Sequence, residues 1–336
     1  MRAIVMHRRG DCNVLSYETV ETPRPAAGEV LVRVHAATVN RIDIYLRTGK
    51  FLLAKELPHI LGADLAGEIV ELGPRVTGWQ VGERVVSSHE GLGRTRNGSY
   101  AEFATLPTGQ LHRLPAGLDY IAAASAGLAF GAAWCALFYG GGLQPAAERV
   151  VVYAATGGVG TAALQIARWQ NARTIAIGSA DKAEALRKLG ADVVLDESYP
   201  DLVERVVGAT GGLGATLVLD AVGRDALQPA VEMLASHGRV VCVGTLSGEQ
   251  AHLNLGDLIA RNATICGSLR SIDPTDFDTV LRLFEAGTFQ PVTNLVLPLE
   301  QAPLAHELLE NRQNFGKIIL VPPRIDDVSA LRPPGR

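Results

Sequence analysis

The stretch that decides the fold spans residues 150–167 and reads VVVYAATGGVGTAALQIA. Its first residues form a continuous apolar run, which is typical of a strand covered on both faces. Three glycines follow at positions 157, 158 and 160, and the residues from Thr161 onward have the spacing of a helix. The segment therefore predicts a buried strand, a tight glycine turn and a helix in immediate succession.

The glycine turn has the spacing of a dinucleotide-binding fingerprint, although Ala155 stands where the first glycine is usual. The second small residue, Gly157, lets the backbone approach a pyrophosphate, and the third, Gly160, lets helix and strand pack closely. The pyrophosphate would rest on the N–H groups of the helix amino terminus. The alternative is a purely structural turn. We expect the whole turn to bind a dinucleotide, through Ala155, Thr156, Gly157, Gly158, Val159 and Gly160.

The alternation of apolar strand and helix continues downstream. The pattern predicts strands over 174–177, 193–195, 216–219 and 239–243, and helices over 161–170, 182–189, 202–209 and 226–235. Buried strands that alternate with helices indicate a parallel sheet with right-handed crossovers. This part of the chain is therefore predicted to be a doubly wound α/β domain.

The first third of the chain has a different pattern, in which apolar and polar residues alternate as in half-buried strands. Strands are predicted over 2–6, 29–36, 65–72, 83–87 and 100–106, separated by Gly, Pro and Asn turn signals. A closing strand is predicted at 317–321. The strands of the first third indicate a small all-β unit, so the chain is predicted to have two domains.

Composition excludes several classes of protein. The 336 residues hold 31 Lys and Arg against 35 Asp and Glu, a formal net charge of −4, which disfavours a nucleic-acid partner. The four cysteines stand singly, which predicts a reducing cytoplasmic compartment. Residues 120–147 carry no charged side chain, but Ala and Gly predominate and Pro145 interrupts them, so we expect a buried helix and no membrane span.

The end of the second predicted strand indicates which dinucleotide is bound. A carboxylate at this place would bind the ribose hydroxyls of NAD, and none occupies the strand end before Ser179. Ser179 can donate a hydrogen bond to a 2′-phosphate and Lys182 can supply the compensating charge, which favours NADP. In the alternative interpretation, Ser179 caps the next helix, Asp181 lies in its first turn and Lys182 is solvated.

Together with the glycine turn, six short segments resemble the medium-chain dehydrogenase/reductase superfamily, in its zinc-independent quinone oxidoreductase branch. They span residues 39–45, 58–67, 82–85, 98–102, 220–223 and 315–317. The resemblance implies a GroES-like β-barrel catalytic domain, at 1–124 and 270–336, and a Rossmann dinucleotide-binding domain at 125–269. It also implies a cofactor, NADPH, in the cleft between them.

The chain lacks the metal ligands of the zinc alcohol dehydrogenases in the same superfamily. Asn40 stands at the position of their first catalytic Cys and Ala63 at that of their His, while no Cys lies within 126–133 or in the loop at 90–97. Because amide and methyl groups do not replace thiolate and imidazole as zinc ligands, we expect no zinc.

Without a Lewis acid, a substrate must itself delocalise the charge that an arriving hydride brings. Quinones and α,β-unsaturated carbonyls do so, and they are the expected substrates. The resemblance places Tyr45 at the nicotinamide end of the cleft, where its phenol could donate a proton. Asn40 could donate through its amide and Asp43 could orient the site. The alternative is that all three only shape the cleft and solvent supplies the proton.

The resemblance implies further contacts and partners. Nicotinamide contacts are expected at Val243, Gly244, Thr245, Gly267, Ser268, Asn314 and Phe315. A homodimer is expected through the last Rossmann strand, 264–269, whose edge would otherwise remain unpaired. Two alternative functions stay open: an enoyl thioester reductase, and a catalytically idle NADPH-binding protein with a structural or sensor role.

Overall fold

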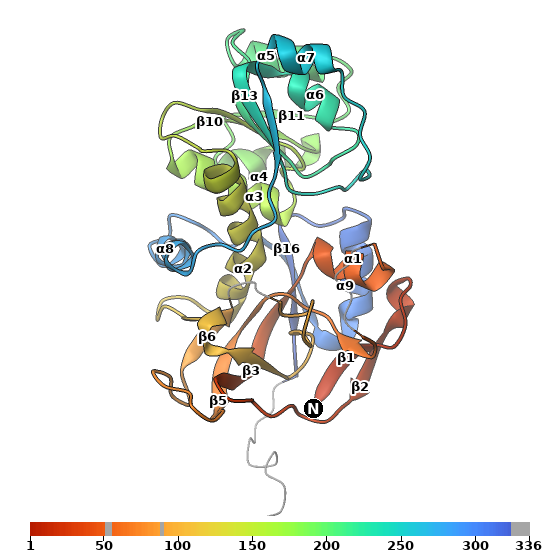
Figure 1. Cartoon of the computed structure of the whole chain (residues 1–336), viewed down its shortest axis with the longest axis vertical. Coiled ribbons are helices and arrows are strands. Elements are labelled where there is room, and N and C mark those ends of the chain that lie inside the picture. The colour runs from red at the N-terminus through yellow and green to blue at the C-terminus, as the bar shows by residue number, and fades with distance from the viewer. Residues whose placement is uncertain (51–55, 88–90, 324–336) are drawn as a thin grey trace, which may run out of the picture.

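The computed structural model describes residues 1–50, 56–87 and 91–323 of the chain. These residues form two lobes stacked along the long axis of the molecule (Figure 1). Helix α2 (Tyr120–Trp134) and strand β16 (Lys317–Val321) run between the lobes. The two lobes therefore meet along a helix and a strand.

The upper lobe is built on six parallel strands in the order β11-β10-β9-β12-β13-β14. The order reverses between β9 and β12, and in such sheets ligands bind beyond the carboxyl ends of the strands at the reversal. The strands are β9 (Arg149–Val152), β10 (Arg173–Ile177), β11 (Val193–Leu195), β12 (Ala215–Asp220), β13 (Leu234–Cys242) and β14 (Thr264–Gly267). The helices are α3 (Gly158–Trp169), α4 (Ala183–Lys188), α5 (Leu202–Ala209), α6 (Leu227–Glu232) and α7 (Leu255–Ala260), with a 3-10 turn at Ala180–Lys182.

The strand, turn and helix predicted from residues 150–167 are present as β9, the glycine turn and α3. Val150 and Val152 pack in one apolar cluster and Val151 packs in another on the opposite face of the sheet. All three are fully buried. Coverage on both faces explains why this strand reads as a continuous apolar run.

The lower lobe is a GroES-like unit of two sheets. One sheet has the order β2-β1-β4, and the other has the order β15-β16-β3-β5-β6-β8, with β7 also paired to β3. Its strands are β1 (Arg2–Met6), β2 (Leu15–Thr19), β3 (Glu29–Val39), β4 (His59–Ile60), β5 (Leu65–Leu72), β6 (Arg84–Ser87), β7 (Phe103–Pro107), β8 (Leu111–Arg113), β15 (Thr293–Pro298) and β16. Its helices are α1 (Arg41–Thr48), α8 (Pro274–Glu285) and α9 (Ala302–Glu310), with 3-10 turns at Cys12–Val14, Thr108–Gln110 and Leu299–Gln301. The expected α/β class, with a Rossmann-type parallel sheet and a GroES-like domain, is confirmed.

Several predicted bounds differ from the structure: β7 begins at Phe103, β14 ends at Gly267, and the helix expected over 226–235 differs most. The helix expected over 226–235 ends at Glu232, because Leu234 already pairs with Ala215 as the start of β13. The pairing of β12 with β13 is irregular between this point and the regular ladder that begins at Leu217 and Arg239. A short apolar run fits a buried helix or a buried strand equally well, so periodicity could not place this boundary.

The uncharged stretch near the middle of the chain forms α2 and a π-helical continuation at Cys135–Gly140. The combined helix is long and apolar enough to cross a membrane by length and composition, but most of it is buried inside the protein. The backbone of α2 is kinked at Gly127, where φ is −44° and ψ is −110°. The predicted boundary between domains, at 124/125, therefore falls within this helix.

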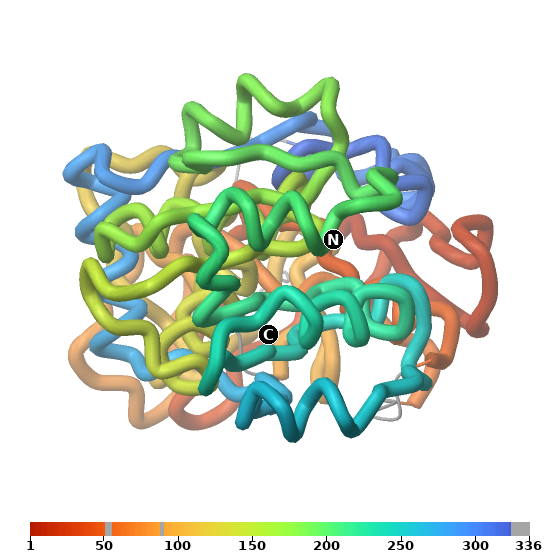
Figure 2. Tube along the Cα trace, turned by 90° about the horizontal axis from the view of Figure 1, so that it is seen from above, coloured from red at the N-terminus to blue at the C-terminus, as the bar shows by residue number. Residues whose placement is uncertain are grey.

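Segments from the two ends of the chain lie side by side in the lower lobe. Figures 1 and 2 both show the blue C-terminal helix α9 beside the red and orange N-terminal segments that include α1. β16 pairs with β3 and with β15. Just before β16, Gly316 pairs with Gly157 of the glycine turn. The predicted cofactor turn is thereby joined by backbone contacts to the lower sheet.

Candidate active site

The three predicted catalytic residues lie together where β3 ends and α1 begins. Asn40 is the N-cap of α1, and Asp43 and Tyr45 lie in its first turns. Asn40 and Asp43 are buried, while Tyr45 is half-buried. A single helix start therefore positions all three side chains.

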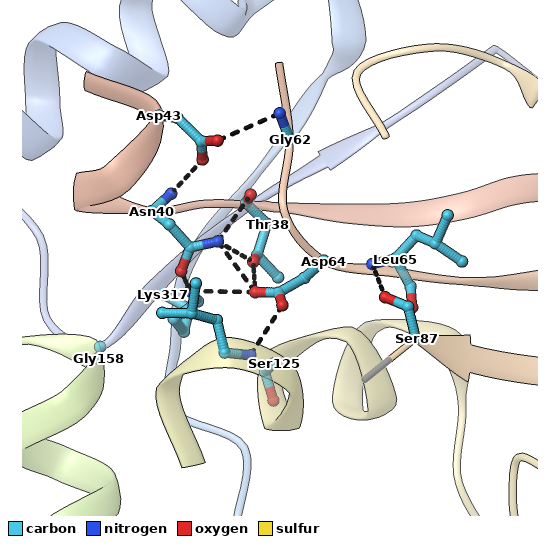
Figure 3. Close-up of polar contacts among 12 residues, drawn as sticks. Thr38, Asn40, Asp43, Gly62, Asp64, Leu65, Ser87, Ser125, Gly158 and Lys317 are labelled. Carbon is cyan, nitrogen blue, oxygen red and sulfur yellow. Dashed lines mark hydrogen bonds and ion pairs between the residues drawn. The ribbon is translucent and has the colours of Figure 1, made fainter. Parts of the chain in front are cut away.

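The amide of Asn40 is fully engaged by neighbouring protein groups (Figure 3). Its Nδ2 donates to Thr38 Oγ1 at 3.0 Å and to Asp64 Oδ2 at 2.9 Å. Its Oδ1 accepts a hydrogen bond from Lys317 Nζ. The amide was expected to donate to a substrate, yet its hydrogens are directed at the protein. The geometry favours Asn40 as a residue that shapes the cleft.

Asp64 is the anionic centre of this cluster, and only 1% of its surface is exposed. Its Oδ2 accepts from Thr38 Oγ1 at 2.6 Å, and its Oδ1 accepts from the backbone N–H of Leu128 at 2.7 Å. A Cβ at position 127 would lie 2.8 Å from Asp64 Cγ, so only glycine fits at the kink. The kink frees the Leu128 N–H, and Asp64 occupies the amino terminus of the second half of α2.

Lys317 supplies the positive charge beside Asp64. Its Nζ lies 3.8 Å from Asp64 Oδ2, and its side chain is 6% exposed. Burial lowers the pKa of Lys317, while Asp64 and Asp43 act in the opposite direction. Asp64 and Lys317 were absent from the predicted site residues. The available signal was that each is a charged residue inside a family-like segment, at 58–67 and 315–317.

Asp43 accepts three hydrogen bonds within the protein. Its Oδ2 accepts from the backbone N–H of Asn40 at 2.9 Å and from the Tyr100 hydroxyl at 3.1 Å, and its Oδ1 accepts from the N–H of Gly62 at 3.1 Å. Burial raises the pKa of Asp43 to about 7, against the lowering effect of these donors. Through these hydrogen bonds Asp43 holds the first turn of α1 against Tyr100 and Gly62.

A chain of hydrogen bonds leads from Asp43 to Arg47. The Tyr100 oxygen lies 3.2 Å from His306 Nε2, and His306 Nδ1 lies 3.3 Å from Arg47 NH1. A guanidinium can only donate, so Nδ1 must accept, Nε2 must carry the hydrogen and Tyr100 must donate to Asp43. Burial lowers the pKa of His306 to about 3, in agreement with a neutral imidazole. We assign His306 as the Nε2–H tautomer on this basis.

Arg47 closes the chain with a bidentate ion pair. Its NH2 lies 2.7 Å from each carboxylate oxygen of Glu310, and its side chain is 1% exposed, whereas that of Glu310 is 32% exposed. Because a guanidinium remains protonated, it cannot pass a proton inward from Glu310. The chain is therefore a rigid support for Asp43.

Tyr45 differs from its two neighbours. Its phenol oxygen is buried and, among the described residues, has no hydrogen-bond partner. Buried hydroxyl groups are normally satisfied by protein, water or ligand. Of the three predicted residues, Tyr45 is therefore the one whose polar group remains available for a bound molecule.

The glycine turn has the two features predicted for Gly157 and Gly160, and a third at Gly158 that was not predicted. A Cβ at Gly157 would meet only Ala154 O, at 3.4 Å, so that face of the turn is open. A Cβ at Gly160 would lie 2.6 Å from Ala155 Cα, which shows how closely α3 packs on β9. A Cβ at Gly158 would lie 2.8 Å from Lys317 Cδ. The turn fits a pyrophosphate at Gly157, while Gly158 provides space for Lys317.

The predicted phosphate-binding residues at the end of β10 are held by one carboxylate. The Ser179 hydroxyl donates to Asp181 Oδ1, and Lys182 Nζ lies 3.0 Å from Asp181 Oδ2. Both side chains are partly exposed. Their groups fit a 2′-phosphate, which would have to compete with Asp181 for them.

The remaining predicted cofactor residues lie at the same end of the sheet as the glycine turn. Val243, Gly244 and Thr245 follow β13, and Gly267 and Ser268 end and follow β14. Asn314 donates from Nδ2 to Gly316 O at 2.7 Å, and Gly316 donates from its N–H to Thr156 O at 2.8 Å. The fold thus brings segments from four parts of the chain to one edge: the turn at 155–160, then 243–245, 267–268 and 314–315.

The donor set does not fit a zinc ion. Among residues 1–50, 56–87 and 91–323, no group of three or more His, Cys, Asp and Glu side chains could hold a metal. Asn40 Oδ1 is occupied by the Lys317 ammonium, and Ala63 offers no ligand. An ammonium at this place would repel a divalent cation.

Two family models match the chain. Residues 26–116 match "Alcohol dehydrogenase GroES-like domain", and residues 158–286 match "Zinc-binding dehydrogenase". A quinone oxidoreductase from Rattus norvegicus is 31% identical over 329 residues, which cover 96% of this chain and 98% of that protein.

Solved structures with the same fold cover 96% of the chain. One described as an NAD-dependent alcohol dehydrogenase is 36% identical, with a TM-score of 0.91 over 99% of its own length. The Escherichia coli quinone oxidoreductase complexed with NADPH is 29% identical, with a TM-score of 0.86 over its full length. The chain is thus similar over nearly its entire length both to a quinone oxidoreductase and to an alcohol dehydrogenase.

Proposed function

Because this chain belongs to the medium-chain dehydrogenase/reductase superfamily, in its quinone oxidoreductase-like branch, we propose that it is an NADPH-dependent, metal-independent reductase of quinones or α,β-unsaturated carbonyls. The observation that carries this proposal is the contact between Lys317 Nζ and Asn40 Oδ1. An amide stands at the position of the first zinc ligand of the zinc alcohol dehydrogenases, and an ammonium occupies its oxygen.

The proposed substrates follow from this chemistry. When bound, the cofactor supplies a hydride from C4 of its nicotinamide. A simple ketone needs a strong electrophile to stabilise the oxyanion that results, as a metal does. Quinones and conjugated enones delocalise that charge themselves, so hydrogen bonds from protein groups are sufficient.

Within this proposal, Tyr45 is the residue that contacts the substrate oxygen. Its phenol oxygen is buried without a protein partner, so it can donate to the oxygen or deliver a proton there. Asn40 and Asp43 hold the start of α1, because their polar groups are engaged by Lys317, Asp64, Tyr100 and Gly62. If Tyr45 only shapes the cleft, solvent supplies the proton.

NADPH is the proposed cofactor. Ser179 and Lys182 offer a hydroxyl and an ammonium at the end of β10, and the end of that strand carries no carboxylate. A structural relative was solved with NADPH, whereas another is described as NAD-dependent. Asp181 competes for both groups, so we propose a preference for NADPH whose strength this carboxylate limits.

Steady-state oxidation of NADPH with a quinone, an enone and an enoyl thioester tests the proposed activity. Turnover of the first two supports it, and faster turnover of the thioester favours an enoyl thioester reductase. Tight NADPH binding without turnover of any substrate would indicate the idle structural or sensor protein. Metal analysis of the active protein should show no stoichiometric zinc, and activity should survive a chelator.

We also propose a homodimer formed through β14. This strand is the edge of the six-stranded sheet, and Leu269 just beyond it is 77% exposed. Pairing of two β14 edges would satisfy their open N–H and C=O groups and cover this side chain. A reducing cytoplasmic location, without a membrane or nucleic-acid partner, remains part of the same proposal, and the four cysteines are unpaired.

A further inference from the structure

Lys317 is the first residue of β16 and directly follows a residue that pairs with the cofactor turn. The preceding residue, Gly316, donates to Thr156 O at 2.8 Å and pairs with Gly157. The aliphatic part of Lys317 lies against Gly158, the first residue of α3, where a Cβ would approach Lys317 Cδ to 2.8 Å. Lys317 is therefore held at the helix terminus where the pyrophosphate is proposed to bind.

The ammonium of Lys317 contacts residues of the lower lobe. Its Nζ donates to Asn40 Oδ1 and lies 3.8 Å from Asp64 Oδ2 (Figure 3). All three side chains are almost fully buried, so neither charge is stabilised by water. Removing one partner of such a pair leaves the other charge buried without a counter-charge, so breaking the contact is costly. Lys317 thus connects α3 of the upper lobe to Asn40 of the lower lobe.

Asn40 in turn fixes the helix that carries Tyr45. It is the N-cap of α1, and its backbone N–H donates to Asp43, three residues into that helix. An anion at the amino terminus of α3 attracts the Lys317 ammonium beside it, and Lys317 is hydrogen-bonded to Asn40. An anion bound at the turn would therefore act, through the contact between Lys317 and Asn40, on the start of α1.

We propose that Lys317 is a positioning residue that couples occupation of the cofactor turn to the placement of helix α1 and its Tyr45. This inference rests on the proposed function, because it assumes that NADPH binds at the turn and that Tyr45 faces the substrate. Hydride transfer depends steeply on the distance between reacting groups, and misplacement by about 1 Å costs about 100-fold in rate. A link between turn and helix would assemble the site only when the cofactor is present.

Amide hydrogen exchange of the α1 peptide, Arg41–Thr48, tests the coupling without any assay of activity. In the wild type, saturating NADPH should slow exchange in α1 by about fivefold or more. In Lys317→Met, which keeps the length of the side chain and removes its charge, α1 should exchange equally with and without NADPH. Saturation of each variant is verified by a binding titration.

Two further variants serve as controls for an unpaired buried charge and for the loss of any lysine. Lys317→Met leaves Asp64 unpaired, so Lys317→Met/Asp64→Asn, which removes both charges, is measured beside it and should show the same loss of coupling. Lys188→Met removes an exposed lysine of α4 and should retain the wild-type response. Protection of α1 by NADPH in both Lys317 variants, as strong as in the wild type, would overturn the inference.

A kinetic cycle distinguishes action through Asn40 from a direct effect on the cofactor. At saturating NADPH, the losses of kcat in Lys317→Met and Asn40→Ala should not add, because both variants break the same contact between Lys317 and Asn40. The losses in Lys182→Ala and Asn40→Ala should add. Additive losses for Lys317 and Asn40 would refute the inference. If the wild type reduces no quinone or enone, the proposed function fails, while the exchange experiment still decides the coupling.

Discussion

The hydroxyl of Tyr100 lies 3.2 Å from Nε2 of His306, a residue 206 positions away in the sequence. The contact joins the segment before β7 to α9 and fixes the direction of the hydrogen bonds from Arg47 to Asp43. Arg47 donates to His306, His306 to Tyr100, and Tyr100 to the carboxylate. Asp43 is thereby held by a chain of hydrogen bonds that ends at the ion pair between Arg47 and Glu310.

Tyr100→Phe should destabilise the protein, more at pH 8 than at pH 6. The change removes a donor from the buried Asp43 and leaves the His306 N–H without an acceptor, at a cost of about 1–3 kcal/mol. The loss of stability grows at higher pH because the hydrogen bond from Tyr100 stabilises the ionised carboxylate more than the protonated carboxyl group. Chemical denaturation at both pH values measures it, with Tyr199→Phe on an exposed tyrosine as control. An equal loss at the two pH values would contradict the assigned direction.

Asp43 should make the free energy of unfolding fall as pH rises from about 4 to about 7. Its carboxyl ionises near 3.8 in the unfolded chain, but its pKa is about 7 in the folded protein. Between these values the folded state binds more protons, so raising the pH favours unfolding, and above pH 7 the effect is complete. The wild type should show this slope relative to Asp43→Asn. A difference between the two that does not change with pH would refute the prediction.

Asp181→Asn should strengthen NADPH binding relative to NADH, whereas Lys182→Ala should weaken it. The first change releases Ser179 and Lys182 from the carboxylate, and the second removes the charge proposed to face the 2′-phosphate. Each preference should shift by about tenfold, the size expected for one charge-assisted hydrogen bond. Fluorescence titrations with both cofactors measure the ratio, with Lys188→Ala as control. Parallel changes for NADPH and NADH in either variant would count against phosphate recognition.

Gly160→Ala should impair folding, whereas Gly157→Ala should impair cofactor binding. Gly160→Ala places a methyl group against backbone atoms of Ala155 and should cost about 1–3 kcal/mol in the cofactor-free protein. Gly157→Ala meets no atom closer than 3.4 Å and should leave stability nearly unchanged, while NADPH binding weakens because the pyrophosphate loses its approach. Thermal unfolding and titration separate the two. Equal NADPH affinity in Gly157→Ala and the wild type would show that the pyrophosphate lies elsewhere.

Leu269→Asp should convert the proposed dimer to a monomer. The substitution places a charge beside the open edge of β14, where it would be buried on pairing without a partner. Light scattering coupled to size exclusion measures the mass. Leu213→Asp, on a leucine that is 65% exposed in the turn before β12, should leave the mass unchanged. A wild-type protein that is already monomeric would refute the proposal directly.

Much of the fold was predictable from local patterns. The apolar run at 150–152, the glycines at 157 and 160 and the helix after them lie within one short segment, and their roles depend on neighbours in the chain. The buried helix over the uncharged stretch was confirmed for the same reason. The start of β13 was misplaced because its apolar residues are buried in either conformation.

The candidate site was predictable only as a set of positions. The resemblance placed Asn40, Asp43 and Tyr45 at the substrate cleft, but all three carry groups that could face a substrate. The structure distinguishes them, because the groups of Asn40 and Asp43 are engaged by residues from other segments while the phenol of Tyr45 is not.

The sequence by itself determined the strand, glycine turn and helix, the two-domain organisation and the absence of thiolate and imidazole at the positions of the zinc ligands. These features depend only on residue types and on spacings of a few positions. Only the tertiary structure decided that Lys317 meets Asn40, 277 positions away, and that His306 supports Asp43 through Tyr100. Such contacts depend on strand order and on how the two lobes meet, and no local periodicity encodes which distant side chains then share one buried site.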